Sequence, residues 1–259
     1  MDNKKIEKLT LVLQKLNQEG VTEALRKEAL DIVSNISPVE LSIAEQNLIE
    51  KGMKPQDLRH LCDIHMEVLK GELDKIKTKI EPGHVVYTLI AEHDKILEFL
   101  TLLEEVNSKI QKSEKYINSL EDIKELKTII FNILDAENHH QREEKVLFTE
   151  MESREITGPT RIMRMEHEDI KAKKEFLKLT LDNASELSPN EFKEFKEKVD
   201  ESAKYIIFNM RDHIFKENYI LYPTAIESIQ GKDIWDDMKR RCDEIGYCGF
   251  TPEDNKELV

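Results

Sequence analysis

The chain has 259 residues, of which 39% are hydrophobic and 36% are charged, with only 8 glycines and 7 prolines. This length suffices for one large domain or two modest ones, and a composition rich in Glu, Lys, Leu and Ile indicates a mainly helical soluble protein. The formal net charge of −14 argues against nucleic acid or an anionic membrane as a partner, because both attract basic surfaces.

The sequence also predicts a cytoplasmic location. It contains no apolar run of the length that a transmembrane helix needs, so no membrane span is expected. The N-terminal residues lack the apolar core of a signal peptide. Three widely spaced cysteines fit a reducing compartment better than a disulfide framework.

Residues 1–80 predict a small domain of short helices whose role is unknown. The first amphipathic run ends near Gly20, and the residues Ser37 to Glu40 have the form of a capping box with proline at the first helical position. Cys62 and His65 are three residues apart on a later run, so both can face one ligand, such as a second metal ion or a heme. The competing interpretation is that they line the packing face of this domain.

A Pro-Gly pair at Pro82 and Gly83 marks the clearest boundary in the chain, because these residues interrupt any helix. Four long helical segments are expected beyond it, at about 84–112, 118–153, 159–182 and 188–231. Their short connections predict an all-α, up-down-up-down four-helix bundle over residues 84–230. Residues 231–259 are expected to add a short amphipathic helix and a tail.

One stretch of the last long segment, residues 206–224, carries His213 and Glu217 four residues apart. A helix places both side chains on one face, and the neighbouring positions of that face are apolar. An unpaired buried carboxylate costs several kcal/mol, so a compensating partner is needed. A metal ion is one candidate for that partner.

The other long segments supply matching groups. His140 and Glu144 are again four residues apart, and His93 and His167 lie on the apolar faces of their segments. His93 and His140 are roughly 28 and 33 Å from the connection between their helices, at about 1.5 Å per residue, so they should lie at similar heights. The predicted metal ligands are His93, His140, Glu144, His167, His213 and Glu217.

Nitrogen and oxygen ligands of this kind suit a pair of first-row metal ions, iron, manganese or zinc, bridged by the two carboxylates.

The alternative register, which uses His139 with Glu143, is rejected because it would move both residues off the apolar stripe. Glu137 is a candidate partner for a ligand imidazole. Tyr87 either reaches the metal pocket or caps the core. Cys242 and Cys248 are expected to be free thiols, with a redox pair as the alternative.

Two stretches, from His140 to Phe148 and from His213 to Pro223, resemble the hemerythrin-like, cation-binding bundle family. The resemblance covers about residues 84–230 and implies a non-heme di-iron centre with bridging carboxylates that binds O₂, NO or peroxide. By the same resemblance, His93 is similar to the ligand of the first helix and His167 to that of the third.

The sequence departs from the oxygen-carrying hemerythrins, which have a second histidine where this chain has Lys171 and a more distant aspartate in place of Glu217. Four histidines with two glutamates look more like the bacterial proteins implicated in repair of iron–sulfur centres under nitrosative or oxidative stress. Residues 1–80 resemble a small helical domain often fused ahead of such bundles, through which a protein partner is expected to bind.

The leading hypothesis is therefore a protein with two non-heme iron ions that binds or reacts with a small oxidant in stress response, sensing or iron handling. A competing hypothesis from the enzyme class is a di-iron peroxidase or an NO reductase-type enzyme. A third is a metal-free helical adaptor.

Overall fold

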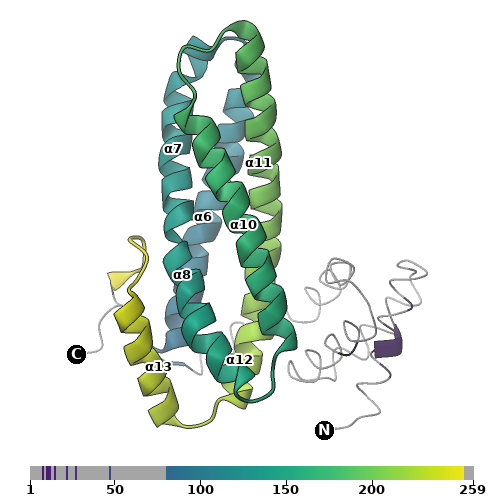
Figure 1. The fold of residues 1–259 in the computed structure, drawn as a ribbon, viewed down its shortest axis with the longest axis vertical. Helices are drawn as coiled ribbons and strands as arrows, with labels where there is room; N and C mark the ends of the chain where they lie inside the picture. The colour runs from purple at the N-terminus through teal and green to yellow at the C-terminus, as the bar shows by residue number, and fades with distance from the viewer. Residues whose placement is uncertain are drawn as a thin grey trace.

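The computed structural model describes residues 80–253 and, upstream of them, only residues 8, 10–12, 15, 22, 27 and 47. The described part of the chain is helical and confirms the all-α prediction (Figure 1). The predicted short helices of residues 1–80, with Cys62 and His65, lie outside the described residues.

Four helical columns form the bundle. The first is α6, Val85–Lys112, and a short 3-10 helix η2, Tyr116–Ser119, leads into the second. The second column consists of α7, Leu120–Asp135, α8, Glu137–Arg142, the π-helical segment η3, Glu143–Leu147, and α9, Phe148–Glu152. The third is α10, Gly158–Asp182. The fourth consists of α11, Pro189–Lys216, the π-helical segment η4, Glu217–Leu221, and α12, Tyr222–Ser228.

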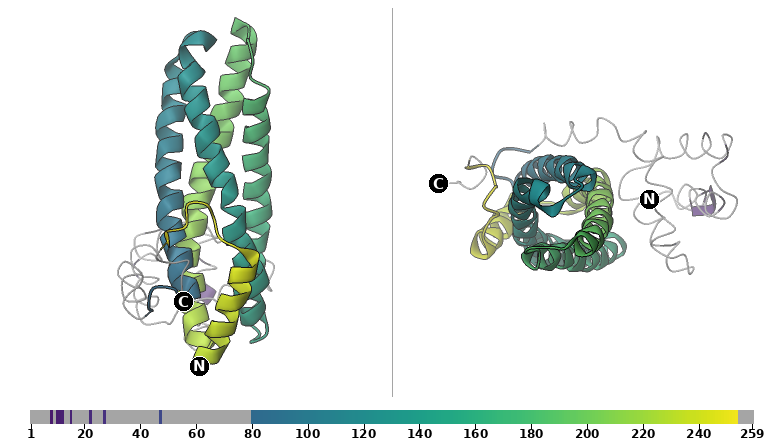
Figure 2. Two further views of the ribbon diagram at one scale, coloured as in Figure 1. Left: turned by 90° about the vertical axis from the view of Figure 1, so that its left-hand side faces the viewer. Right: turned by 90° about the horizontal axis from the view of Figure 1, so that it is seen from above.

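The columns alternate in direction, as the short connections predict. The α6–α7 and α10–α11 connections lie together at the upper end in Figure 1, and α12 lies at the opposite end, near the turn that precedes α10. The view from above in Figure 2 shows the four columns arranged as a ring. The up-down-up-down bundle is therefore confirmed for the described residues.

Local sequence signals explain where two of the columns begin. Ser188 and Glu191 form a complete capping box at the start of α11, in which the Ser188 backbone N–H donates to the Glu191 carboxylate at 2.9 Å. Pro189 follows at the first helical position, where its missing N–H costs no helical hydrogen bond. At the start of α6, His84 Nδ1 accepts from the backbone N–H of Val86 at 3.2 Å.

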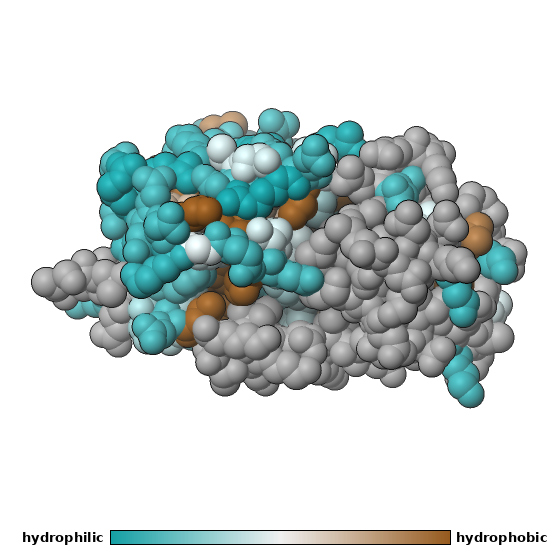
Figure 3. All heavy atoms as spheres, turned by 90° about the horizontal axis from the view of Figure 1, so that it is seen from below, coloured by the Kyte–Doolittle hydropathy of each residue, from teal (hydrophilic) through white to brown (hydrophobic). Residues whose placement is uncertain are grey.

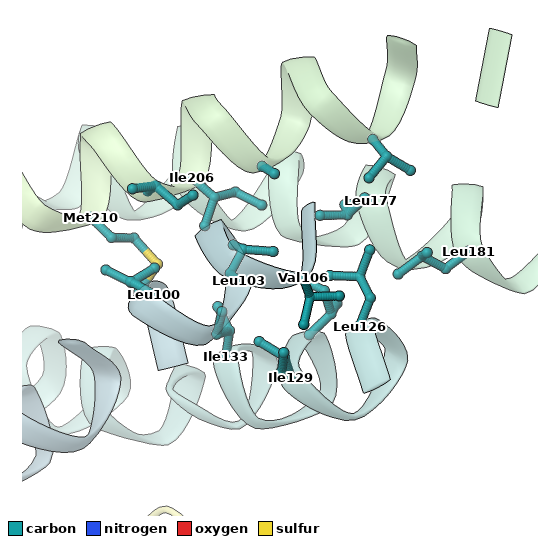
Figure 4. Packing of buried hydrophobic residues seen from close by; sticks show 14 of the residues in the cluster. Leu100, Leu103, Val106, Leu126, Ile129, Ile133, Leu177, Leu181, Ile206 and Met210 are labelled. Carbon is teal, nitrogen blue, oxygen red and sulfur yellow. The ribbon is translucent and has the colours of Figure 1, made fainter. Parts of the chain in front are cut away.

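Apolar side chains from all four columns fill the half of the bundle that carries the α6–α7 connection. Figure 4 shows these side chains pointing toward one another between the helices. They include Leu100, Leu103 and Val106 of α6, Leu126, Ile129 and Ile133 of α7, Leu177 and Leu181 of α10, and Ile206 and Met210 of α11. This packing fixes the positions of the four helices along the bundle axis. It therefore also fixes the level of the buried histidines and glutamates in the other half of the bundle.

The helix α13, Lys232–Ile245, lies outside the ring of four columns, beside α8 and α6 (Figure 2). It buries Met238 and Cys242, and Trp235 Nε1 donates to the carbonyl of Ile229 at 3.0 Å. The end of the molecule seen in Figure 3 is mostly hydrophilic where it is coloured, with small hydrophobic areas between polar residues. Among the described residues, no helix combines the length and the apolar character that crossing a bilayer requires.

Candidate metal centre

A cluster of histidines and glutamates lies inside the bundle at the level where α8 continues into η3 and α11 into η4. All four columns contribute to it, and each of these residues is at most 4% exposed. The cluster consists of His93, His139, His140, Glu143, His167, His213 and Glu217.

The cluster contains three overlapping groups of potential ligands, and the first, the His93 group, is formed by His93, His139 and Glu217. The Nε2 atoms of His93 and His139 are 3.1 Å apart. His93 Nε2 is also 3.0 Å from Glu217 Oε2. Three potential ligand atoms therefore face one point, which lies between α6, α8 and the start of η4.

The second group is the His213 group, formed by His140, His167 and His213. His213 Nε2 lies 2.8 Å from Glu217 Oε1, and His167 Nε2 lies 3.6 Å from the same oxygen. The ring of His140 stacks on that of His167, with centroids 4.0 Å apart. Three imidazoles thus face a second point beside the first.

Two carboxylates link the His93 and His213 groups, and with His167 and His213 they form the third group. Glu217 directs Oε2 toward the His93 group and Oε1 toward the His213 group. Glu143 Oε2 lies 3.4 Å from His139 Nε2 and 3.5 Å from His167 Nε2, so it also faces both groups. A carboxylate with this placement can bridge two ions.

The outward nitrogen of each of four histidines is held by a hydrogen bond. His93 Nδ1 donates to the amide oxygen of Asn218 at 2.8 Å. The other three donate to carboxylates: His139 to Glu92 at 2.8 Å, His167 to Glu144 at 2.7 Å and His213 to Glu166 at 2.9 Å. These bonds leave Nε2 as the free nitrogen and aim it inward, as in many histidine metal sites.

The carboxylate behind His139 belongs to a buried network. Glu92 accepts from Arg142 Nη2 at 2.6 and 2.7 Å and from the Thr251 hydroxyl. Glu92 and Arg142 are 0% and 1% exposed. Arg142 Nη2 is also 3.8 Å from Cys248 Sγ. The segment after α13 therefore completes the environment of a histidine from α8.

The protonation of the cluster follows from its charges. Burial opposes the charged form of His213, but the Glu217 and Glu166 carboxylates raise its pKa to about 10. Burial likewise opposes the charged form of His139, and Glu143 and Glu92 raise its pKa to about 9. At neutral pH, without a cation, these two imidazoles carry the protons that balance the buried carboxylates.

Several buried atoms of the cluster form no hydrogen bond of good geometry with any described residue, although His213 Nε2 and Glu217 Oε1 are at ion-pair distance, and such atoms are costly when buried. They are His140 Nδ1, Glu143 Oε2, His167 Nε2, His213 Nε2 and both carboxylate oxygens of Glu217. All belong to the cluster, and nitrogen and oxygen atoms of this kind are the ligands that first-row divalent metals accept. The donor set therefore fits metal ions.

Five of the six residues predicted from the sequence lie in the cluster, namely His93, His140, His167, His213 and Glu217. Glu144 is not part of it, because its side chain is 32% exposed and holds the outward nitrogen of His167. His139 and Glu143 take part instead, and both are buried. The expectation that the His139–Glu143 register lies off the apolar stripe is therefore wrong, since both side chains point into the bundle.

The π-helical turn at η3 explains the difference. The backbone N–H of Phe148 donates to the carbonyl of Glu143, five residues back, instead of four. One extra residue in this turn shifts everything after it by one position relative to a continuous α-helix. Counting back from the apolar residues Leu147 and Met151 with α-helical spacing leads to Glu144. The sequence pattern therefore selects Glu144, although Glu143 is the residue that faces the cluster.

Glu92 and Arg142 were not predicted from the sequence. Glu92 precedes His93 and Arg142 follows His140, but neither stands at a helical spacing that marks it as part of a site. For His139 and Glu143 a signal exists, since two His-Glu pairs at a spacing of four stand side by side. Glu137, expected beside a ligand imidazole, lies 3.4 Å from His140 Nδ1. Cys242 and Cys248 are free and buried, as the preferred interpretation has it.

Buried histidines and carboxylates, supplied by all four helices of an up-and-down bundle, define a four-helix bundle protein with a candidate centre for metal cations. The family model for the hemerythrin HHE cation binding domain matches residues 84–225, which is more than half of the chain, and the chain belongs to this family. A second model, for a family of unknown function (DUF438), matches residues 9–75. No curated protein matches the chain.

Proposed function

We propose that the bundle holds two non-heme iron ions and binds or reacts with a small oxidant, O₂, NO or peroxide, in stress response, sensing or iron handling. The observation that carries this proposal is the set of buried, unpartnered nitrogen and oxygen atoms in two adjacent groups. Manganese and zinc are the other metals that such donors accept.

In this proposal His93 and His139 hold one ion, while His140, His167 and His213 hold the other. Glu143 and Glu217 would serve both ions, because each faces both groups. Glu144, which the sequence suggested as a bridge, orients His167. Iron in such a site supplies redox chemistry and coordination positions for a small ligand.

The protein's own groups would tune that site. The carboxylates behind His139, His167 and His213 make the imidazoles better electron donors to a cation. Burial of the whole cluster to 4% exposure or less keeps bulk water out and restricts the ligand to a small molecule. Because His139 and His213 carry protons without a cation, metal binding must displace those protons.

A metal-free adaptor is less consistent with these observations. An adaptor gains nothing from five buried imidazoles and two buried carboxylates. Three of the imidazole nitrogens and three of the carboxylate oxygens form no hydrogen bond among the described residues, and each such atom destabilises the fold. The enzyme alternative, a peroxidase or NO reductase-type activity, uses the same centre and differs only in requiring turnover with an electron donor.

The test is a metal analysis of the purified protein together with its absorption spectrum before and after anaerobic reduction and after addition of O₂, NO or peroxide. The proposal predicts about two iron ions per chain and a near-ultraviolet absorption that reduction removes and an oxidant restores. Less than one metal ion per chain would favour the adaptor. A metal-loaded protein whose spectrum responds to neither reductant nor oxidant would refute a redox role.

A matched pair of variants separates the cluster from other histidines of the bundle. His213→Ala should lower the metal content, whereas His84→Ala, at the cap of α6, should leave it unchanged. Steady-state consumption of peroxide or NO by the wild-type protein with an electron donor would establish the enzyme alternative.

A further inference from the structure

A buried tyrosine outside the predicted set of ligands reaches the His93 group. Tyr222 is 0% exposed, and its hydroxyl lies 3.3 Å from His93 Nε2 and 3.4 Å from His139 Nε2. The same hydroxyl donates to Glu143 Oε1 at 2.7 Å. Its ring is stacked nearly parallel to that of His93, with centroids 5.5 Å apart. The phenol oxygen therefore lies among the atoms assigned to one metal ion.

The spacing of these atoms matches that of neighbouring ligands on one ion. Two ligand atoms each about 2.1 Å from an ion, and at right angles to each other, are about 3.0 Å apart, and a tetrahedral arrangement gives about 3.4 Å. The His93–His139 and His93–Glu217 pairs, at 3.1 and 3.0 Å, fit this spacing. The phenol oxygen fits it with both histidines, at 3.3 and 3.4 Å.

The second π-helical turn, η4, delivers the phenol to this place. The backbone N–H of Tyr222 donates to the carbonyl of Glu217, five residues back. In a continuous α-helix at about 100° per residue, Tyr222 would be rotated about 140° away from Glu217. The wide turn brings the two side chains back to one face. Pro223 follows, and because it has no N–H the α-helical bond to Tyr219 is lost in any case.

A purely structural tyrosine does not account for this arrangement. A core aromatic residue needs only its ring, and a buried hydroxyl needs one hydrogen-bond acceptor. Here the hydroxyl is placed against two ring nitrogens and a carboxylate at once, in the part of the cluster where the Glu217 oxygens form no hydrogen bond with a described residue.

We propose that Tyr222 is a ligand of the metal ion held by His93 and His139, binding it as a phenolate. This inference rests on the proposed dinuclear iron function. When the oxygen–metal bond forms, the O–H bond breaks and the proton passes by way of the Glu143 carboxylate, to which it already points, to the buffer. No change of oxidation state is needed. The phenolate occupies a coordination position that an external ligand would otherwise take, and its negative charge favours ferric over ferrous iron.

The consequence is an asymmetric centre. Tyr222 completes the His93 group. Apart from the carboxylates that it shares with the His93 group, the His213 group offers only histidine nitrogens among the described residues. A small external ligand is therefore directed to the ion of the His213 group. Reversible binding at the His93 group would require the phenol to leave first.

The experiment compares the oxidised, iron-loaded wild-type protein with Tyr222→Phe and with a control, Tyr219→Phe. Tyr219 lies in η4 too, but its ring stacks on Phe215. Each protein is analysed for iron content, for visible absorption, for phenolate ring modes in resonance Raman spectra excited within that absorption, and for reduction potential.

The proposal predicts a phenolate-to-iron absorption and Raman signature in the wild-type protein and in Tyr219→Phe, its loss in Tyr222→Phe, and a more positive potential in that variant. Iron-loaded wild-type protein without the phenolate signature would overturn the proposal while leaving the dinuclear function standing. Protein that binds no iron would overturn both. If Tyr222→Phe does not fold, wild-type protein that contains ring-deuterated tyrosine decides the question. Its phenolate Raman bands must shift on deuteration, and the same bands must persist in Tyr219→Phe.

Discussion

Replacing Arg142 by Met should strongly destabilise the metal-depleted protein. The guanidinium is 1% exposed and binds the fully buried Glu92 carboxylate at 2.6 and 2.7 Å. In the variant that carboxylate keeps, among the described residues, only His139 and Thr251 as partners. Because the site is closed to solvent, water cannot replace the lost partner.

The size of the effect follows from the burial of the pair. Removing one partner of a buried ion pair costs roughly 3–5 kcal/mol. For a chain of this size, each kcal/mol lowers the melting temperature by about 2–4 °C, which gives a decrease of roughly 6–20 °C. Arg211→Met is the control, because Arg211 and its partner Glu104 are 41% and 60% exposed. An exposed pair of this kind contributes about 0–1 kcal/mol.

The assay is thermal unfolding of Arg142→Met, Glu92→Gln and the double variant after removal of metal with a chelator. The double variant should be more stable than Arg142→Met, since it leaves no buried charge without a partner. A melting temperature for Arg142→Met close to that of Arg211→Met would refute this account of the network. So would a double variant whose loss equals the sum of the two single losses.

Four further predictions concern pH, metal binding and packing. Burial opposes the charged forms of Glu92 and Glu166, but their cationic partners lower both pKa values to about 2. The metal-depleted protein should therefore lose stability as the pH falls from about 4.5 toward 2. A urea unfolding midpoint that stays constant over that range would contradict this prediction. The raised pKa values of His139 and His213 have the opposite effect, since the stability they contribute is complete below about pH 6.5 and should be lost as the pH rises through 9 to 10. For the same reason, adding metal at neutral pH should release protons in a weakly buffered titration, and no release would refute the assigned charges. Leu126→Ala, in the apolar half of the bundle, should cost about 2–5 kcal/mol in urea unfolding without changing the metal content.

The helices and their inward faces could be predicted from the sequence because apolar residues recur at helical spacing and strong punctuation separates the segments. The capping box at Ser188 and the Pro-Gly pair at residues 82 and 83 are local signals of this kind. Four of the histidines, together with Glu217, could be predicted for the same reason, since each interrupts an otherwise apolar face.

The remaining parts of the site depend on departures from α-helical periodicity. The wide turns beginning at Glu143 and Glu217 shift the phase of two helices, and nothing in the spacing of apolar residues reveals a shift of one position. Glu143 in place of Glu144 follows from the first turn, and the position of Tyr222 from the second. Pro223, inside a helical segment, was the one local sign that the α-helical hydrogen bonds are interrupted there.

The network behind His139 could not be predicted because it is formed by long-range contacts. Thr251 and Cys248 lie beyond the residues that match the hemerythrin domain, and only the path of the chain after α13 brings them to Glu92 and Arg142. The predicted division into residues 1–80, 84–230 and 231–259, the cytoplasmic location and a protein partner for residues 1–80 stay predictions.

The metal content of two neighbouring variants, Glu143→Gln and Glu144→Gln, tests the proposed centre most directly. The two substitutions are chemically identical and one residue apart, but only Glu143 faces both histidine groups. The account predicts that Glu143→Gln falls from about two iron ions per chain to one or fewer, while Glu144→Gln keeps about two, because losing a partner of a ligand histidine lowers affinity only 10–100-fold. Full metal content in Glu143→Gln together with loss in Glu144→Gln would contradict it.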